Sequence, residues 1–298
     1  GNEKEVRFLP RILQVPMGTG ERRLKRLIVT GDDFGLSLPI NEAIEQAHTN
    51  GILTTTCLMM SGAAVADAVA RARRLPELGV GLHVVAVCGR PVLPIEEVSG
   101  LVGADGRFDD NLIRAGFRYF FLPHVRQQLE AEIRAQFQAF RETGLALDHA
   151  NAHNHMHIHP TLLGTILRIG REFGLKAVRV PFEPDFQGRS RSLGARFVAI
   201  WIDAMKRRVR KQGLRYNEYI FGLENTGQMD RDHILPIIKD LPDGVSEIFS
   251  HPATGRWDGI DPAASDYRFE AEFAALIDED VRVSVEASGA QLISYRDI

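Results

Sequence analysis

The feature that most constrains the fold is a repeated alternation of short apolar runs with amphipathic stretches. Runs rich in β-branched residues predict buried strands at 26–30, 52–60, 80–86, 177–180, 246–250 and 281–285. Stretches with helical spacing lie between them, at 39–50, 63–75, 125–143, 161–173 and 269–277. The alternation is typical of parallel βαβ units, and seven or eight such units fit a single-domain α/β fold. We therefore expect a (β/α) barrel-like fold related to the TIM barrel, incomplete or distorted.

The runner-up fold is a doubly wound open sheet, but the Gly-x-Gly-x-x-Gly turn that would favour it is absent after the first run. Residues 1–25 are polar and rich in proline and glycine, so we expect a tail or strap before the domain at 26–298. Residues 89–118 are predicted to be rich in loops. A basic amphipathic insertion at about 189–213 interrupts the alternation.

Composition narrows the class of protein. The formal net charge is −3, which does not favour nucleic-acid binding. No apolar run is long enough to predict a membrane-spanning helix. The two cysteines, Cys57 and Cys88, lie in apolar stretches and are predicted to be buried thiols of a reducing compartment. We therefore expect a cytoplasmic protein.

The densest cluster of reactive side chains is the segment His149–His159, which holds five of the ten histidines. Four of them occupy every second position: His153, His155, His157 and His159. In a β-strand all four would project to one side. Imidazoles pack poorly as a hydrophobic face and are the commonest metal ligands, so the segment predicts a metal or proton-transfer site. A histidine-rich surface tract is the alternative.

Other polar residues follow the predicted strands. Asp32 and Asp33 come directly after the first strand, His83 interrupts the third, and His251 follows the strand at 246–250. In barrel enzymes the active site lies at the C-terminal ends of the strands, so these side chains can converge. A plain turn at Asp32-Asp33 and a core histidine at position 83 are the alternatives.

One carboxylate and two imidazoles can bind a divalent cation and leave positions open for water and substrate. A second carboxylate can take a proton from water, and a histidine outside the metal site can protonate a leaving group. The constellation therefore indicates metal-assisted hydrolysis of an amide or ester. A serine hydrolase with a Gly-x-Ser-x-Gly elbow is not indicated, because that motif is absent.

Four motifs, in this order, resemble those of the YdjC-like carbohydrate deacetylases: Thr-Gly-Asp32-Asp33-Phe-Gly-Leu-Ser, Gly-Leu-His83, His153-x-His155-x-His157 and His251-Pro252. The resemblance implies a barrel-like (β/α) fold and removal of an acetyl group from an N-acetylated sugar. It also implies one divalent metal ion, held by Asp33, His83 and His153, with Asp32 as the base.

Four further residues are assigned roles at the site. His251 is the candidate acid for the leaving amine, and His155, His157 and Arg179 are expected to bind substrate. Either His155 or His157 could take the place of His153 as a ligand. Magnesium and zinc are the first candidates for the metal, although the ligand set also suits manganese, cobalt and nickel.

One motif departs from the family pattern. Many members carry Asp-Ser before the first histidine of the run, whereas this chain carries Asn151-Ala152. Asn151 can accept a hydrogen bond but brings no charge to orient a histidine. With the segments 90–94 and 247–252, the motif resembles the hopanoid-biosynthesis-associated branch of the family. That resemblance implies action on the N-acetylglucosaminyl group of a hopanoid lipid.

The insertion fits a lipid-linked substrate. Phe197, Ile200 and Trp201 fall on one helical face, and five of the six residues 206–211 are cationic. Such a helix can lie in a membrane interface, so we expect peripheral contact with the inner face of a membrane. A helix packed on the barrel is the alternative. Three other functions stay open: deacetylation of soluble chitooligosaccharides, metal-dependent hydrolysis of another amide or a phosphoester, and sugar binding without catalysis.

Overall fold

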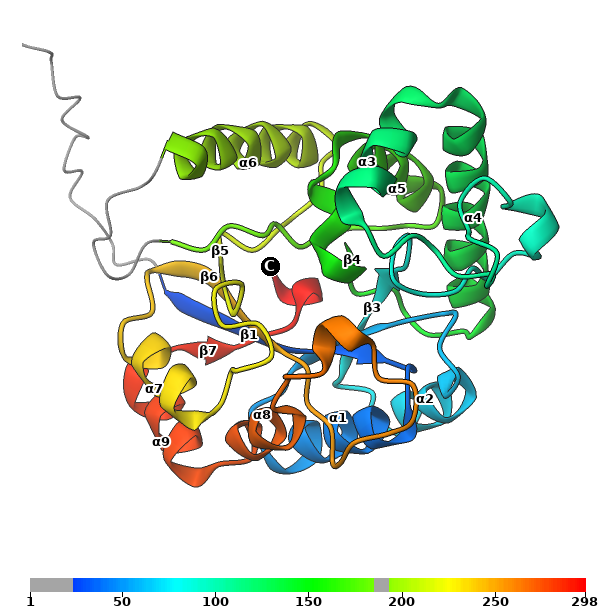
Figure 1. Ribbon diagram of the computed structural model, residues 1–298. Helices are drawn as coiled ribbons and strands as arrows, with labels where there is room; N and C mark the ends of the chain where they lie inside the picture. Colours follow the sequence, from blue (N-terminus) through cyan, green and yellow to red (C-terminus); the bar gives the residue numbers. More distant parts are fainter. Residues whose placement is uncertain (1–23, 185–192) are drawn as a thin grey trace, which may run out of the picture.

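Strand β1 (Lys25–Phe34) lies at the centre of a curled parallel sheet (Figure 1). The computed structural model describes residues 24–184 and 193–298, without the side chains of residues 193–199. The other strands are β2 (Thr55–Leu58), β3 (Gly79–Val84), β4 (Ala150–Ala152), β5 (Tyr219–Phe221), β6 (Gly244–Ser250) and β7 (Gln291–Leu292). Their order is β4-β3-β2-β1-β6-β5, and β7 pairs with the first residues of β1. The predicted tail at 1–25 lies, except for two residues, outside the described part, as does the start of the predicted insertion.

Isolated bridges link the two edges of this sheet. Val178 bridges Ala150 of β4, and Ala177 bridges Arg215, which precedes β5. The predicted strand at 177–180 is thus a pair of bridges, and the sheet curls into a barrel-like wall instead of staying open. The predicted single-domain α/β fold is confirmed in this form. The seven strands of the described residues are fewer than the eight of a complete TIM barrel.

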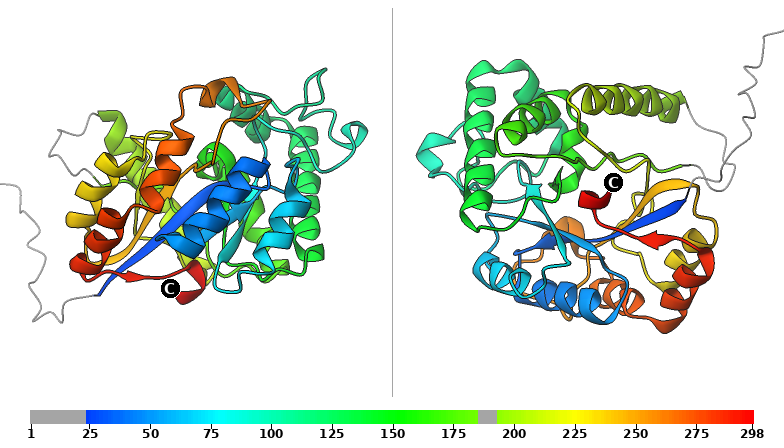
Figure 2. Two further views of the ribbon diagram at one scale, coloured as in Figure 1. Left: turned by 90° about the horizontal axis from the view of Figure 1, so that it is seen from below. Right: turned by 180° about the vertical axis from the view of Figure 1, so that it is seen from behind.

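Helices surround the sheet on its outer side (Figure 2). Proline occupies the first turn of α1, α4 and α5, where its missing N–H group costs no helical hydrogen bond. Among the described residues, no helix is both long and apolar enough to cross a bilayer. The helices are α1 (Leu38–Asn50), α2 (Val65–Ala72), α3 (Leu112–Phe121), α4 (Pro123–Glu142), α5 (Pro160–Glu172), α6 (Leu193–Lys211), α7 (Arg231–Lys239), α8 (Phe269–Leu276) and α9 (Glu279–Ser288).

The predicted strand at 281–285 is wrong, because these residues lie inside α9. The Asp278 side chain accepts a hydrogen bond from the Val281 N–H at 3.0 Å and caps the helix. Val281 and Val285, four residues apart, are buried, whereas Val283 between them is 48 % exposed. A strand would have placed all three on one face.

The predicted histidine-rich strand is also wrong beyond Ala152. β4 ends there, and His153–Ile158 forms the 3₁₀ helix η2. Asn154 and His155 have positive φ angles of 51° and 52°, which turn the chain sharply. The alternate histidines therefore do not share one face. Helix α3 lies at the end of the stretch predicted as loop, and β5 and α7 were likewise not predicted.

Candidate active site and metal centre

A pocket of about 550 Å³ opens where β1, β3 and β4 end. β1 extends four residues past its predicted end, so it carries both Asp32 and Asp33. Adjacent residues of a regular strand point to opposite faces. Here the pairing register with β2 shifts between Gly31 and Phe34, and Asp33 has a φ of 67°. The irregularity allows both carboxylates to line the pocket.

Three side chains from different elements converge at this pocket. The Oδ1 atom of Asp33 lies 3.3 Å from Nε2 of His83 and 3.2 Å from Nδ1 of His153. The two ring nitrogens are themselves 3.2 Å apart. Asp33 Oδ1 is buried and has no hydrogen-bond partner among the described residues. A buried, unpartnered carboxylate oxygen facing two imidazole nitrogens fits a divalent cation.

The ring of His83 is held by a side chain behind it. Nδ1 of His83 lies 2.7 Å from Oδ1 of Asn151, whose amide nitrogen donates to the Cys57 sulfur at 3.4 Å. A proton on Nδ1 satisfies the Asn151 oxygen and leaves the lone pair of Nε2 available to a cation beside Asp33. Asn151 thus occupies an orienting position as a neutral acceptor, despite the missing charge.

Electrostatics favour an ionised Asp33. Burial by itself raises the pKa of this carboxyl, but His153 and His83 outweigh burial and hold the pKa well below its usual range. Burial likewise opposes the charged form of His153, and Asp33 nevertheless raises the pKa of that imidazole. The centre is therefore a carboxylate that attracts positive charge.

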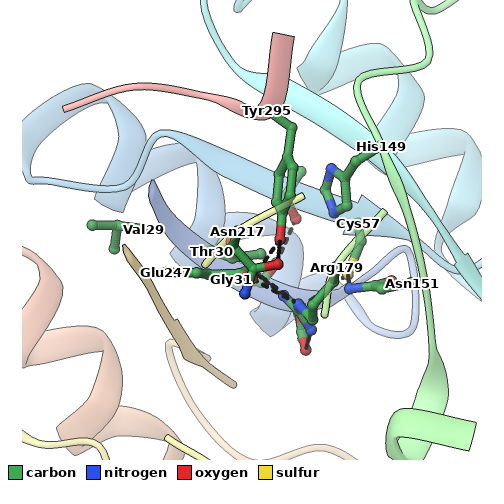
Figure 3. Close-up of polar contacts among 12 residues, drawn as sticks. Val29, Thr30, Gly31, Cys57, His149, Asn151, Arg179, Asn217, Glu247 and Tyr295 are labelled. Atoms are coloured by element: carbon green, nitrogen blue, oxygen red, sulfur yellow. Dashed lines mark hydrogen bonds and ion pairs between the residues drawn. The ribbon is translucent and has the colours of Figure 1, made fainter. Parts of the chain in front are cut away.

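Asp32 belongs to a buried network through its contact with Arg179. Figure 3 shows other members of this network, Arg179, Glu247, Thr30 and Tyr295. Arg179 donates two hydrogen bonds to the Asp32 carboxylate, at 2.7 and 2.8 Å, and contacts Glu247 at 2.7 Å. Glu247 also accepts from the hydroxyls of Thr30 at 2.6 Å and Tyr295 at 2.5 Å. Burial of Asp32 raises its pKa, but the Arg179 guanidinium dominates and lowers the pKa below its usual range.

The short helix η4 (Tyr295–Asp297) closes the end of the barrel away from the pocket, and Figure 1 shows it inside the curled sheet. Oxygens of Asp148 accept from the backbone N–H groups of Tyr295 and Arg296, at 3.3 and 2.9 Å. The Tyr295 ring stacks on His149 with centroids 4.2 Å apart. Tyr295 thus reaches Glu247 from the opposite end of the barrel.

The structure brings most of the predicted site residues to the pocket wall: Asp32, Asp33, His83, His153, His155 and His251. His157 and Arg179 do not line it, and both are fully buried. Nδ1 of His157 accepts from the Ala152 N–H at 3.2 Å, and its Nε2 lies 3.1 Å from the Arg179 carbonyl oxygen. Both side chains therefore lie behind the pocket wall, and their contact with substrate stays a prediction. Of the three candidate ligand histidines, only His153 joins the Asp33–His83 group within the described residues.

His251 reaches the pocket from the end of β6. Its backbone N–H donates to Glu272 at 2.5 Å, which fixes the chain at this point. Its ring packs near Tyr267, with centroids 5.1 Å apart, and its Nδ1 has no hydrogen-bond partner among the described residues. This buried Nδ1 lies 4.0 Å from a Glu272 carboxylate oxygen, which helps to position the imidazole at the pocket wall.

Several residues of the site were missed at the level of sequence. Glu247 had a signal, because a carboxylate inside the apolar strand 246–250 needs a buried partner. Tyr295 had no comparable local signal for its contacts. The aromatic part of the pocket wall, Trp257, Tyr267 and Phe269, comes from the segment around α8 and was also missed. The cysteines are free as predicted, but Cys88 is only half-buried and lines the pocket.

We predict that Arg179→Met lowers the free energy of unfolding by about 3–5 kcal/mol, because two buried carboxylates lose their cation. Urea unfolding measures this loss. The control is Arg168→Met, which breaks an exposed ion pair with Glu130 of the same 2.7 Å length and should cost about 1 kcal/mol or less. Because Arg179 lowers the pKa of Asp32, its stabilisation is present above about pH 4 and declines as the pH falls. Equal losses in the two variants would contradict the prediction.

The chain is similar to known proteins over most of its length. The model of the YdjC-like protein family matches residues 26–287. A carbohydrate deacetylase of Brevibacillus brevis is 33% identical over 76% of this chain and 81% of the relative. A human carbohydrate deacetylase is 29% identical over 92% of this chain and 91% of its own. A crystal structure from Enterococcus faecalis V583, provisionally described as a cellobiose-phosphate cleavage protein, has a TM-score of 0.71 at 25% identity, covering 92% of this chain and 98% of its own. The chain belongs to the YdjC-like protein family.

Proposed function

We propose that this protein is a metal-dependent hydrolase that removes the N-acetyl group from an N-acetylglucosaminyl sugar. The observation that carries the proposal is the convergence of Asp33, His83 and His153 beside a second carboxylate, Asp32. His251 adds an imidazole on the same pocket wall. The names of the relatives, carbohydrate deacetylases, support an acetylated sugar as substrate.

Asp33, His83 and His153 would hold the divalent cation, with magnesium and zinc as the first candidates. A bound cation of this kind polarises a carbonyl group and lowers the pKa of a coordinated water. Asn151 keeps the His83 ring in the orientation that directs Nε2 at the site. The open part of the pocket leaves room for the acetyl group.

Asp32 is assigned as the general base. The two hydrogen bonds from Arg179 fix the plane of its carboxylate, and the lowered pKa keeps it ionised at neutral pH. A carboxylate with a lowered pKa is a weaker base, so position and charge count for more than basicity here. His251 is assigned as the acid that protonates the leaving amine, since its imidazole lines the pocket and its Nδ1 has no hydrogen-bond partner among the described residues.

The sugar is proposed to lie against the aromatic wall of the pocket. Trp257 and Tyr267 offer flat apolar surfaces, and the carboxylate of Asp261 offers an acceptor for hydroxyl groups. A volume of about 550 Å³ is within the range of small-ligand sites. We further propose that the sugar is linked to a hopanoid lipid, on the basis of the motifs at 90–94, 151–160 and 247–252.

The reaction is tested by acetate release. The purified protein, stripped of metal and then reloaded, is incubated with N-acetylglucosaminyl hopanoid and, in parallel, with di-N-acetylchitobiose. Metal-dependent release from either supports a deacetylase, and preference for the first supports the lipid-linked substrate. Release of phosphate from a phosphorylated disaccharide without acetate release would favour another hydrolase. Sugar binding without turnover would leave a binding protein.

We predict that His83→Ala and His153→Ala each lose the metal, because two ligands alone bind a divalent cation weakly. Elemental analysis of the purified variants measures the content. His157→Ala is the matched control, since this buried histidine of the same motif lies outside the cluster and should keep its metal. Full metal occupancy in both ligand variants would refute the assignment.

We predict that Asp32→Asn retains the metal and loses kcat by about 10²–10⁴-fold, the usual contribution of a general base. The amide keeps the shape of the carboxyl group but cannot take a proton. Asp33→Asn provides the comparison and should lose metal. If Asp32→Asn loses the metal while Asp33→Asn keeps it, the two roles are exchanged.

We predict that His251→Ala lowers kcat and removes one limb of the pH–rate profile, because the leaving amine then lacks its proton donor. The profile is measured on the variant and on His124→Ala, an exposed histidine of α4 outside the pocket. An unchanged profile in His251→Ala would remove this residue from the mechanism.

A further inference from the structure

Helix α3 turns its most apolar side to solvent. Ile113, Phe117, Phe120 and Phe121 follow helical spacing and are 47–86 % exposed. The buried side of the same helix consists of the smaller Ala115 and Gly116 together with Tyr119. An amphipathic helix of a soluble domain normally buries its large apolar side chains. A contiguous exposed patch of this kind marks an interaction site.

Helix α6 continues this patch. Ile200 and Trp201 are 66 % and 43 % exposed, and the Trp201 ring N–H donates to the Ile158 carbonyl oxygen at 2.8 Å. The next residue, His159, has its ring 6.3 Å from that of Phe120 on α3. We call these six exposed apolar side chains the α3–α6 face: Ile113, Phe117, Phe120, Phe121, Ile200 and Trp201.

Helix α6 is nevertheless anchored on the barrel, which was the alternative to a helix in the membrane interface. Ile202, Met205 and Val209 are buried, and Lys206 is half-buried with its ammonium 4.1 Å from the Phe182 ring centroid. The ammonium of Lys206 is therefore not part of a solvent-facing cationic run. Phe197, also predicted for the exposed face, lies among the side chains that the structure does not describe.

A cationic hollow borders the α3–α6 face. Phe120 lines it together with four arginines of α4, α5 and α6: Arg126, Arg168, Arg171 and Arg208. Its volume is about 550 Å³, and no carboxylate is among the described residues that line it. Arg126 and Arg208 donate to backbone carbonyl oxygens, and Arg168 pairs with Glu130. The chain as a whole is acidic, so this positive charge is local.

We propose that the α3–α6 face and its cationic hollow dock the protein on an anionic lipid bilayer. Aromatic and aliphatic side chains can enter the interface between headgroups and acyl chains, while arginines bind lipid phosphates. The positive charge of the hollow favours an anionic lipid surface as the binding partner. A second copy of the chain would have to place carboxylates opposite the arginines. Among the described residues, no carboxylate lines the hollow, so two copies of this face would not complement each other.

The docking face is joined to the pocket mouth. Cys88 and Arg107 line the pocket, and the Cys88 N–H donates to the carbonyl oxygen of Asp109, just before α3. Docking through α3 would therefore bring the pocket mouth close to the lipid headgroups. Binding of lipid by this face does not depend on the reaction proposed above.

The test is co-sedimentation of the full chain with vesicles of phosphatidylcholine, alone or mixed with phosphatidylglycerol. We expect binding to the anionic vesicles and weaker binding at raised salt. Arg168→Gln with Arg171→Gln should lower the partition coefficient about 25-fold, because each cation near an anionic surface contributes about fivefold. Phe117→Ser with Phe121→Ser should abolish binding. Matched controls on other helices, Lys239→Gln of α7 and Val283→Ser of α9, should bind as the wild type does.

Three outcomes would overturn the proposal: no binding of the wild type to anionic vesicles, equal binding of the wild type and the aromatic variant, or equal binding of the wild type and the arginine variant. Analytical ultracentrifugation supplies an independent check. A wild-type dimer that Phe117→Ser with Phe121→Ser converts to a monomer would assign the face to a second copy instead. Acetate release from a soluble sugar, measured on the same variants, should be unchanged and keeps failure of docking distinct from failure of the reaction.

Discussion

The interaction on which the rest of the structure depends is the ion pair of Arg179 with Asp32 and Glu247. The guanidinium is fully buried, and a buried charge without partners costs several kcal/mol. Its partners come from β1 and β6, and Tyr295 of η4 adds a hydroxyl to Glu247. The network therefore joins both ends of the barrel, and any other register of these strands would leave at least one charge unpaired.

The same constraint separates the roles of two adjacent aspartates. Asp32 faces Arg179, and the left-handed backbone of Asp33 directs the next carboxylate toward His83 and His153. A non-glycine residue in this conformation costs about 1–3 kcal/mol and persists where the surroundings determine it. The cost is consistent with a functional position, since a regular strand would have sent the two carboxylates to opposite sides of the sheet.

The sequence predicted the parallel α/β architecture and the convergence of Asp32, Asp33, His83, His153 and His251 on one pocket, because strand ends and polar motifs are local patterns. The prediction was wrong where the local sequence pattern suited two kinds of secondary structure equally well. The alternate histidines suit a strand, and only the tertiary contacts turn them into η2. The alternate valines of α9 suit a strand too, until the Asp278 cap is known. Helix α3 was not predicted because its large apolar residues face solvent. The partners of Arg179 were not predicted because they are distant in the chain.

That distance has a consequence for how the molecule folds. Thr30 and Glu247 are 217 positions apart, and Asp32 is 147 positions from Arg179, as Asp148 is from Tyr295. Domains dominated by such non-local contacts fold slowly, because loop-closure entropy is lost before the contacts form. No stretch of the chain shorter than that from Thr30 to Tyr295 contains the whole network. During synthesis the guanidinium of Arg179 therefore follows the carboxylate of Asp32 by 147 residues, and β2, β3 and β4 are made between them.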